Sequence, residues 1–143
     1  MTIIYTDGAC KGNPGPGGWG AYIIFKDNVK KELYGYEKFT TNNRMELIAA
    51  IKALDYFKIS QELILFTDSS YLKLGITSWL NNWKQKEWKN SQKKNIKNKD
   101  LWTELDSLNT FHKVEWHWVK AHNGNEGNEI ADMLANKAIE IKQ

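Results

Sequence analysis

The chain has 143 residues, a single cysteine and a formal net charge of +3. This length fits one domain spanning residues 1–143, and a lone cysteine excludes an intramolecular disulfide, so we expect one domain in a reducing compartment, the cytoplasm. The N-terminal sequence MTIIYTDGAC is unlike a signal peptide and no apolar run approaches ~18 residues, which argues against a secreted or membrane-bound protein.

The first half of the chain is rich in predicted strands. Short apolar, β-branched segments predict strands at 2–6, 19–25 and 29–36, with a hairpin at 26–28. The intervening sequence GACKGNPGPGG, residues 8–18, predicts a loop because glycine and proline dominate it. Apolar residues at helical spacing then predict a helix over 41–57. The continuous apolar run at 63–67 is typical of a strand covered on both faces.

The second half of the chain is mainly helical. Helices are predicted at 69–76, 79–88, 100–108 and 128–141. Between the last two of these, Val114, Trp116 and Trp118 alternate with polar residues, which is strand periodicity. The order of elements describes an α/β fold with a mixed sheet and helices packed on its faces.

One basic segment stands out on an otherwise balanced chain. Residues 79–99 contain seven lysines, three tryptophans and one acid, Glu87. A solvated helix with a few core tryptophans would explain this composition.

Each of four acidic residues has an ordinary structural interpretation. Asp7 precedes a glycine, as in an Asp-Gly turn. Glu46 follows Asn43 by three residues, as in a helix capping box. Asp68 suits the N-cap of the next helix, and Asp132 suits an exposed position on the last one.

Together, the four acids indicate a metal site. If the first and fourth strands are neighbours, Asp7 and Asp68 meet at one edge of the sheet, where ligand sites gather in α/β proteins. Glu46 and Asp132 could reach the same edge. Clustered carboxylates repel one another unless protons or cations neutralise them, and oxygen ligands favour Mg²⁺ or Mn²⁺. Two such ions ~3.5–4 Å apart can cleave a phosphodiester bond.

Five segments carry a resemblance to a known family. They are YTDGACKGNPGPGGWGAYI, TTNNRMELIAAIKAL, FTDSSY, WLNNWKQKEWK and WVKAHNGNEGNEIADMLA. In this order and spacing the set resembles the bacterial type 1 ribonucleases H over almost the whole chain. The resemblance implies a ribonuclease H-like fold, with a five-stranded mixed sheet flanked by helices on both faces.

The resemblance also implies an activity. The protein would be a monomeric endonuclease that hydrolyses the RNA strand of RNA–DNA hybrids, leaving 5′-phosphate and 3′-hydroxyl ends. Asp7, Glu46, Asp68 and Asp132 would be catalytic and would bind two Mg²⁺ ions with substrate, for which Mn²⁺ could substitute. Asp7 would bridge both ions, Glu46 and Asp68 would serve the ion nearer the leaving group, and Asp132 the ion that carries the attacking water. His122 matches a catalytic histidine that assists proton transfer or product release, although a loop histidine with local hydrogen bonds would fit too.

The same resemblance implies contacts with the hybrid. Contacts to the minor groove, where the 2′-hydroxyl distinguishes RNA, would come from Gly8, Cys10, Asn13, Asn42, Asn43 and Ser70. The alternative is that the asparagines stabilise a turn or cap a helix and do not contact the hybrid. A basic protrusion would hold DNA through Trp79, Trp83, Lys84, Lys86 and Lys89. Thr41 and Asn98 match positions that hold a DNA phosphate.

Three positions depart from the family pattern. Ser70 stands where glutamine is usual, and Phe39 stands near a usual arginine, with Lys38 before it. The loop after His122 reads NGNEGNE and has no proline. These departures weaken the expectation of substrate contacts but affect none of the four acids.

Two rival functions remain open at this point. One is another nuclease of the wider superfamily, such as a transposase or integrase core, which would cleave plain duplex DNA. The other is a catalytically inactive module that binds hybrids. Retention of all four acids argues against the inactive module.

Overall fold

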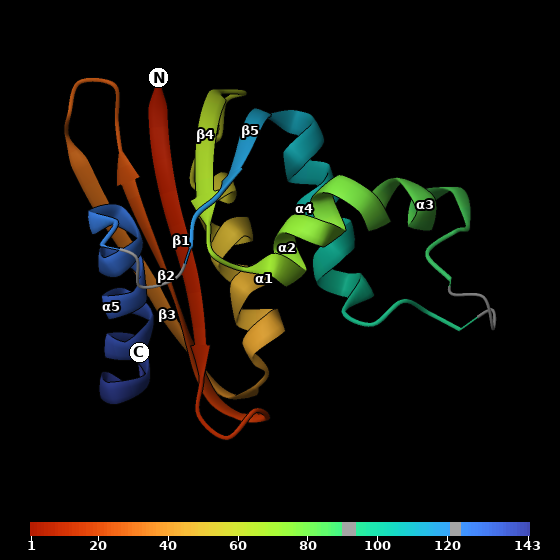
Figure 1. Ribbon diagram of the computed structural model, residues 1–143, viewed down its shortest axis with the longest axis horizontal. Helices are drawn as coiled ribbons and strands as arrows, with labels where there is room; N and C mark the ends of the chain where they lie inside the picture. The colour runs from red at the N-terminus through yellow and green to blue at the C-terminus, as the bar shows by residue number, and fades with distance from the viewer. Residues whose placement is uncertain (90–93, 121–123) are drawn as a thin grey trace.

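The strands form one mixed sheet in the order β3-β2-β1-β4-β5. The computed structural model describes residues 1–89, 94–120 and 124–143 (Figure 1). β2 pairs antiparallel with β1 and β3, whereas β1, β4 and β5 run parallel. The strands are β1 (Thr2–Cys10), β2 (Gly15–Ile24), β3 (Lys30–Thr40), β4 (Glu62–Thr67) and β5 (Lys113–Trp118).

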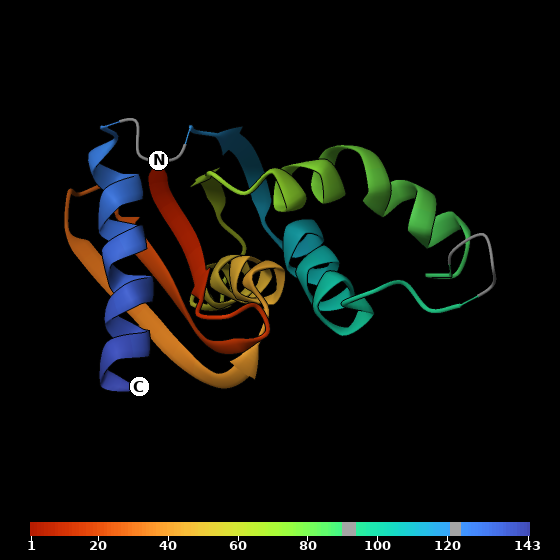
Figure 2. The same ribbon diagram turned by 60° about the horizontal axis from the view of Figure 1, so that its bottom comes forward.

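Helices cover both faces of this sheet, as the sequence predicts. α5 (Glu126–Ile141) packs on β1, β2 and β3 from one side, and α1 (Asn42–Asp55) and α4 (Lys99–Phe111) lie on the other (Figure 2). The core lies between the sheet and α1, where Ile4, Ile23, Leu47, Leu54 and Leu65 are buried with other apolar residues. None of the described helices is long and apolar enough to cross a membrane.

The predicted loop over residues 8–18 is wrong. β1 continues to Cys10 and β2 already begins at Gly15, so only residues 11–14 connect them. Gly18 and Gly20 in β2 pair with β1, and α5 lies directly against them. A Cβ at Gly18 or Gly20 would overlap the backbone of α5 at Ala135 or Ala131. These glycines therefore serve close packing between sheet and helix, which glycine content alone does not reveal.

The two helices predicted at 69–76 and 79–88 form one continuous helical run. It consists of α2 (Ser70–Leu74), the π-helical turn η1 (Gly75–Trp79) and α3 (Leu80–Gln85). No proline interrupts these residues, so a single wider turn replaces the expected break. Trp88 lies beyond the helix with a φ of 63°. This run projects α3 away from the sheet (Figure 1).

A buried histidine joins three elements at the end of the sheet remote from the acids. His112, directly after α4, lies with its Nε2 2.9 Å from the Leu54 carbonyl, and its Nδ1 accepts the Gln61 N–H at 3.1 Å. We expect His112→Ala to lower the free energy of unfolding by about 2 kcal/mol, because both backbone groups would lose their partner. Chemical denaturation measures this loss. The control His117→Ala, at an exposed position, should change stability by less than about 0.5 kcal/mol.

Candidate active site

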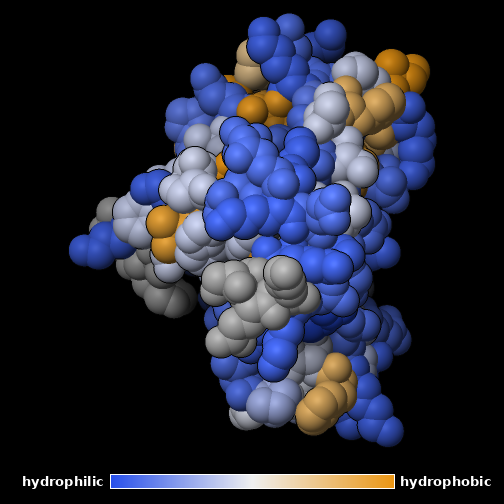
Figure 3. All heavy atoms as spheres, turned by 90° about the vertical axis from the view of Figure 1, so that its right-hand side faces the viewer, coloured by the Kyte–Doolittle hydropathy of each residue, from blue (hydrophilic) through white to orange (hydrophobic). Residues whose placement is uncertain are grey.

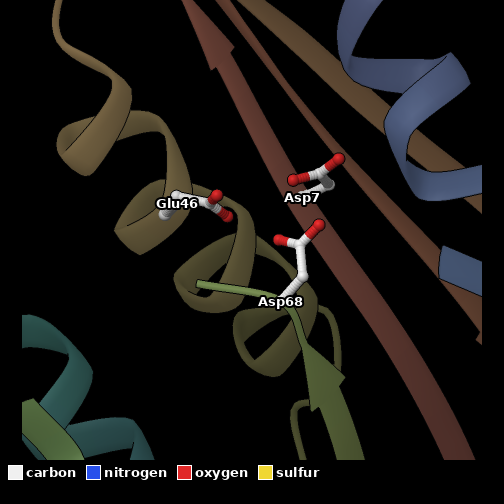
Figure 4. Close-up of side chains that lie close together, drawn as sticks. All are labelled: Asp7, Glu46 and Asp68. Atoms are coloured by element: carbon white, nitrogen blue, oxygen red, sulfur yellow. The ribbon is translucent and has the colours of Figure 1, made fainter. Parts of the chain in front are cut away.

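Three carboxylates meet where β1 and β4 end. Asp7 lies on β1 opposite Gly20, Asp68 directly follows β4, and Glu46 projects from the second turn of α1. Ligand oxygens of the three side chains lie within 4.8 Å of one another. Figure 4 shows the carboxylates turned toward a common point. β1 and β4 are neighbours, which is the condition under which the sequence places Asp7 and Asp68 at one edge of the sheet.

None of the three acids has the ordinary role that its local sequence allows. Asp7 lies within a strand and not in a turn. The N-cap of α1 is Thr41, whose hydroxyl accepts the Arg44 N–H, so Asn43 and Glu46 form no capping box. Ser69, and not Asp68, caps α2. The carboxylates of Asp7, Glu46 and Asp68 therefore need another explanation.

Gly8 allows Glu46 to reach the strand. A Cβ at Gly8 would overlap the backbone of Met45 and Glu46 in α1, so only glycine permits this approach. The Gly8 N–H also donates a hydrogen bond of 2.9 Å to Asp7 Oδ1. One glycine thus brings Glu46 close to the strand and orients the Asp7 carboxylate.

Burial and mutual repulsion favour the neutral form of the cluster. Burial, together with the nearby Asp68 and Asp132, raises the pKa of Asp7 to about 9. Burial raises the pKa of Glu46 well above its usual range, and the charges of Asp7 and Asp68 add to this effect. The pKa of Asp68 is raised too, chiefly by burial. At neutral pH the cluster therefore favours binding of protons or of cations.

The donor set fits a hard divalent cation. All candidate ligand atoms are carboxylate oxygens, which suit Mg²⁺, Mn²⁺ or Ca²⁺ rather than softer metals. Glu46 Oε1 is buried and has no hydrogen-bond partner among the described residues. A buried acceptor without a donor is costly, and a bound cation would remove that cost.

Asp132 lies beside the three acids, on α5. Its oxygens do not belong to the group formed by Asp7, Glu46 and Asp68, whose ligand oxygens lie within 4.8 Å of one another. Its carboxyl nevertheless contributes to the raised pKa of Asp7. Asn128, one turn earlier on α5, is buried, and its side chain partly offsets the rise in the pKa of Asp68. Sequence analysis missed Asn128. Its position four residues before Asp132, on the same helix face, is the signal that could have identified it.

Comparison with known proteins identifies the family. A model of the RNase H family matches residues 1–140. Ribonuclease H of Francisella tularensis subsp. novicida (strain U112) is 62% identical over 137 residues, which cover 96% of this chain and 90% of that protein. The chain belongs to the RNase H family.

Solved structures of RNases H share the fold. LC9-RNase H1, a type 1 RNase H with the type 2 active-site motif, is 34% identical with a TM-score of 0.90, covering 99% of this chain and 73% of that one. LC11-RNase H1 in complex with an RNA/DNA hybrid is 26% identical with a TM-score of 0.76, and 99% of each chain is covered.

Several residues expected to read the minor groove in this RNase H lie close to the acids. Gly8 and Cys10 continue β1 beyond Asp7. The Asn13 side chain accepts the Asn42 N–H at 2.9 Å, so it ties the β1–β2 connection to the start of α1. Asn42 and Asn43 are exposed at that end of α1. Ser70, at the start of α2, is exposed as well.

The expected phosphate site is organised by an arginine. Arg44 forms two hydrogen bonds with the Asp100 carboxylate, at 2.8 and 3.1 Å, and a third of 3.2 Å with Asn98 Oδ1. The Asn98 amide also donates to the Tyr71 hydroxyl at 3.1 Å. These bonds hold the Asn98 side chain, and its backbone has a left-handed conformation with a φ of 61°. Thr41 caps the same end of α1 that carries Arg44.

The basic protrusion combines packed tryptophans with exposed lysines. Trp79 and Trp83 pack edge-on or tilted against neighbouring rings, with centroids at most 5.7 Å apart, so they serve partly as core. The rings are those of Tyr71, Trp102 and each other. The lysines of α3 and beyond, Lys84, Lys86 and Lys89, are exposed. The side of the molecule that bears the protrusion is mainly hydrophilic (Figure 3). His122, expected to be catalytic, lies outside the described residues.

Proposed function

We propose that this chain cuts the RNA strand of RNA–DNA hybrids as a Mg²⁺-dependent monomeric endonuclease of the cytoplasm. The observation that carries the proposal is the cluster of Asp7, Glu46 and Asp68 in a chain of the RNase H family. The hybrid-bound structure of a family member, LC11-RNase H1, supports the choice of substrate. Mg²⁺ would be held by Asp7, Glu46, Asp68 and Asp132, with Mn²⁺ as a substitute.

Each residue of the site has a separate role in hydrolysis. Bound divalent ions supply charge neutralisation at the scissile phosphate and an activated water nucleophile. Asp7 occupies the centre, fixed by the Gly8 N–H and adjacent to Asp68 and Asp132. Glu46 offers a buried oxygen with no hydrogen-bond partner among the residues that the structure describes, and Asp68 is only half-buried. His122, whose motif resembles that of the family's catalytic histidine, would assist proton transfer or product release.

Recognition of the hybrid falls to the surface around the acids. Gly8, Cys10, Asn13, Asn42, Asn43 and Ser70 would meet the minor groove, where the 2′-hydroxyl distinguishes RNA from DNA. Thr41 and Asn98 would hold a DNA phosphate. Trp79, Trp83 and the lysines of the protrusion would hold the DNA strand.

The lysines differ in how freely they can bind phosphate. Lys84 forms an ion pair of 3.3 Å with Asp106, whereas no ion pair involves Lys86 or Lys89 among the described residues. We expect the double substitution of Lys86 and Lys89 by alanine to raise the KM for hybrid and to reduce the slope of log KM against log salt by roughly 2.

Steady-state kinetics at several salt concentrations test this expectation. Lys84→Ala, the matched control in the same segment, should have a smaller effect because Asp106 already neutralises its charge. An unchanged salt slope in the double variant would show that these lysines form a solvated face and bind no phosphate.

The chemistry of the product ends tests the reaction itself. Hydrolysis with an activated water should leave RNA fragments that carry a 5′-phosphate and a 3′-hydroxyl, so a polymerase should extend them directly. Fragments ending in a 2′,3′-cyclic phosphate would contradict the proposal, because they arise when the 2′-hydroxyl attacks. Cleavage of plain duplex DNA under the same conditions would instead favour a transposase-like nuclease.

A further inference from the structure

Trp118, the last residue of β5, contacts the segment that carries Asp68. Its indole Nε1–H donates a hydrogen bond of 3.2 Å to the Asp68 backbone carbonyl. The residue is exposed, with 47% of its surface accessible to solvent. A half-exposed tryptophan beside an active site suggests a substrate contact, but this hydrogen bond indicates a different role.

Three contacts join the end of β5 to the residues around Asp68. The Val119 N–H donates to the Thr67 carbonyl at 2.9 Å, which continues the hydrogen bonding between the ends of β5 and β4. The Trp118 indole N–H donates to the carbonyl of Asp68, the residue after Thr67. The Lys73 ammonium group, on α2, lies 5.1 Å from the centre of the Trp118 ring, at cation–π distance. Trp118 therefore contacts the chain on both sides of the Ser69 cap.

Asp68 needs such support more than the other two acids. Asp7 lies within the paired part of β1 and Glu46 within α1, so regular structure fixes both backbones. Asp68 follows the last paired residue of β4 and precedes the helix cap, between two elements.

We propose that Trp118 is a positioning residue, which holds the Asp68 backbone so that its carboxylate faces Asp7 and Glu46 and can share a divalent cation with them. This inference rests on the proposed function. A hydrogen bond to a residue that holds a metal orients the ligand, and its loss typically weakens metal binding about 10- to 100-fold. Trp118 orients Asp68 through the backbone carbonyl of Asp68.

The test compares two substitutions that each remove one indole N–H from β5. Trp118→Phe keeps an aromatic ring near Lys73 but cannot bond to Asp68. Trp116→Phe is the matched control, because the Trp116 indole donates to Asn109 Oδ1 at 2.9 Å, a different element from the one that carries Asp68. The melting temperature of each protein without metal reports any general loss of stability.

Two measurements follow for each variant. The first is the rise in melting temperature on titration with MgCl₂ in the absence of nucleic acid. The second is kcat and KM for hybrid over a range of Mg²⁺ concentrations. We expect Trp118→Phe to need about tenfold more Mg²⁺ for the half-maximal effect in both, with KM at saturating Mg²⁺ changed less than about twofold. Trp116→Phe should match the wild-type protein.

Other outcomes would overturn the inference. A metal requirement equal to that of Trp116→Phe would show that the indole bond does not position Asp68. A raised KM with an unchanged metal requirement would make Trp118 a substrate contact. If the wild-type protein fails to cleave hybrid while the two thermal titrations still differ, the positioning role stands and the proposed function fails.

Discussion

Asp7→Asn should reduce hybrid cleavage by at least about 10³-fold while leaving binding of the hybrid within about twofold of wild type. Asp7 is central among the acids, since Asp68, Asp132 and Glu46 all interact with it. An amide is neutral and offers one oxygen and one NH₂ group, so it cannot replace a carboxylate between cations. Hybrid contacts elsewhere on the surface do not depend on this charge.

Single-turnover cleavage and a separate binding titration measure the two effects. Asp55→Asn is the matched control, because Asp55 is an exposed carboxylate at the end of α1 whose partner is Lys58. The control should cleave at the wild-type rate. Cleavage by Asp7→Asn at a wild-type rate would remove Asp7 from the proposed site, and loss of binding as well would indicate a structural defect.

The second large effect concerns stability and pH. The pKa of Asp7 is raised to about 9 in the folded protein, above its ordinary value of 3.8. Between these values the folded state binds more protons than the unfolded state, so stability is full below about pH 4 and declines as the pH rises toward 9. The three carboxyls titrate as a coupled set, and the decline belongs to all of them.

We expect the metal-free protein to lose at least about 3 kcal/mol of unfolding free energy between pH 5 and pH 9, at about 1.4 kcal/mol for each unit of pKa difference. Added Mg²⁺ should restore most of this loss, because cations then replace the protons. Asp7→Asn without metal should show a flatter profile and exceed wild-type stability at pH 9. Denaturant titrations across this pH range test the expectation, and coincident profiles for wild type and Asp7→Asn would refute it.

The sequence predicts the architecture well where hydrophobic patterning dominates. The apolar runs of β1 and β4 predict two strands, and the pairing of these strands brings Asp7 and Asp68 together. The helical spacing of α1 places Glu46 near the same edge. The strands and the helix follow from patterning alone, whereas the pairing of β1 with β4 is a tertiary contact.

What the sequence fails to predict depends on contacts between distant elements. Gly18 and Gly20 belong to a paired strand in which α5 leaves no room for a Cβ, and nothing in their local sequence indicates this helix. Thr41 and Asn43 as alternative caps place the start of α1 less than one helical turn apart, and local residue preferences cannot decide between them. Trp118 looks like an ordinary strand residue until the sheet places its indole at the Asp68 carbonyl.

The most direct test of the account is incubation of the wild-type protein with an RNA–DNA hybrid in which each strand carries a different label, in the presence of Mg²⁺. The account predicts that the RNA strand is cut internally, that the DNA strand stays intact, and that a chelator stops the reaction. Binding of the hybrid without cleavage at any Mg²⁺ or Mn²⁺ concentration, or cutting of the DNA strand, would contradict it.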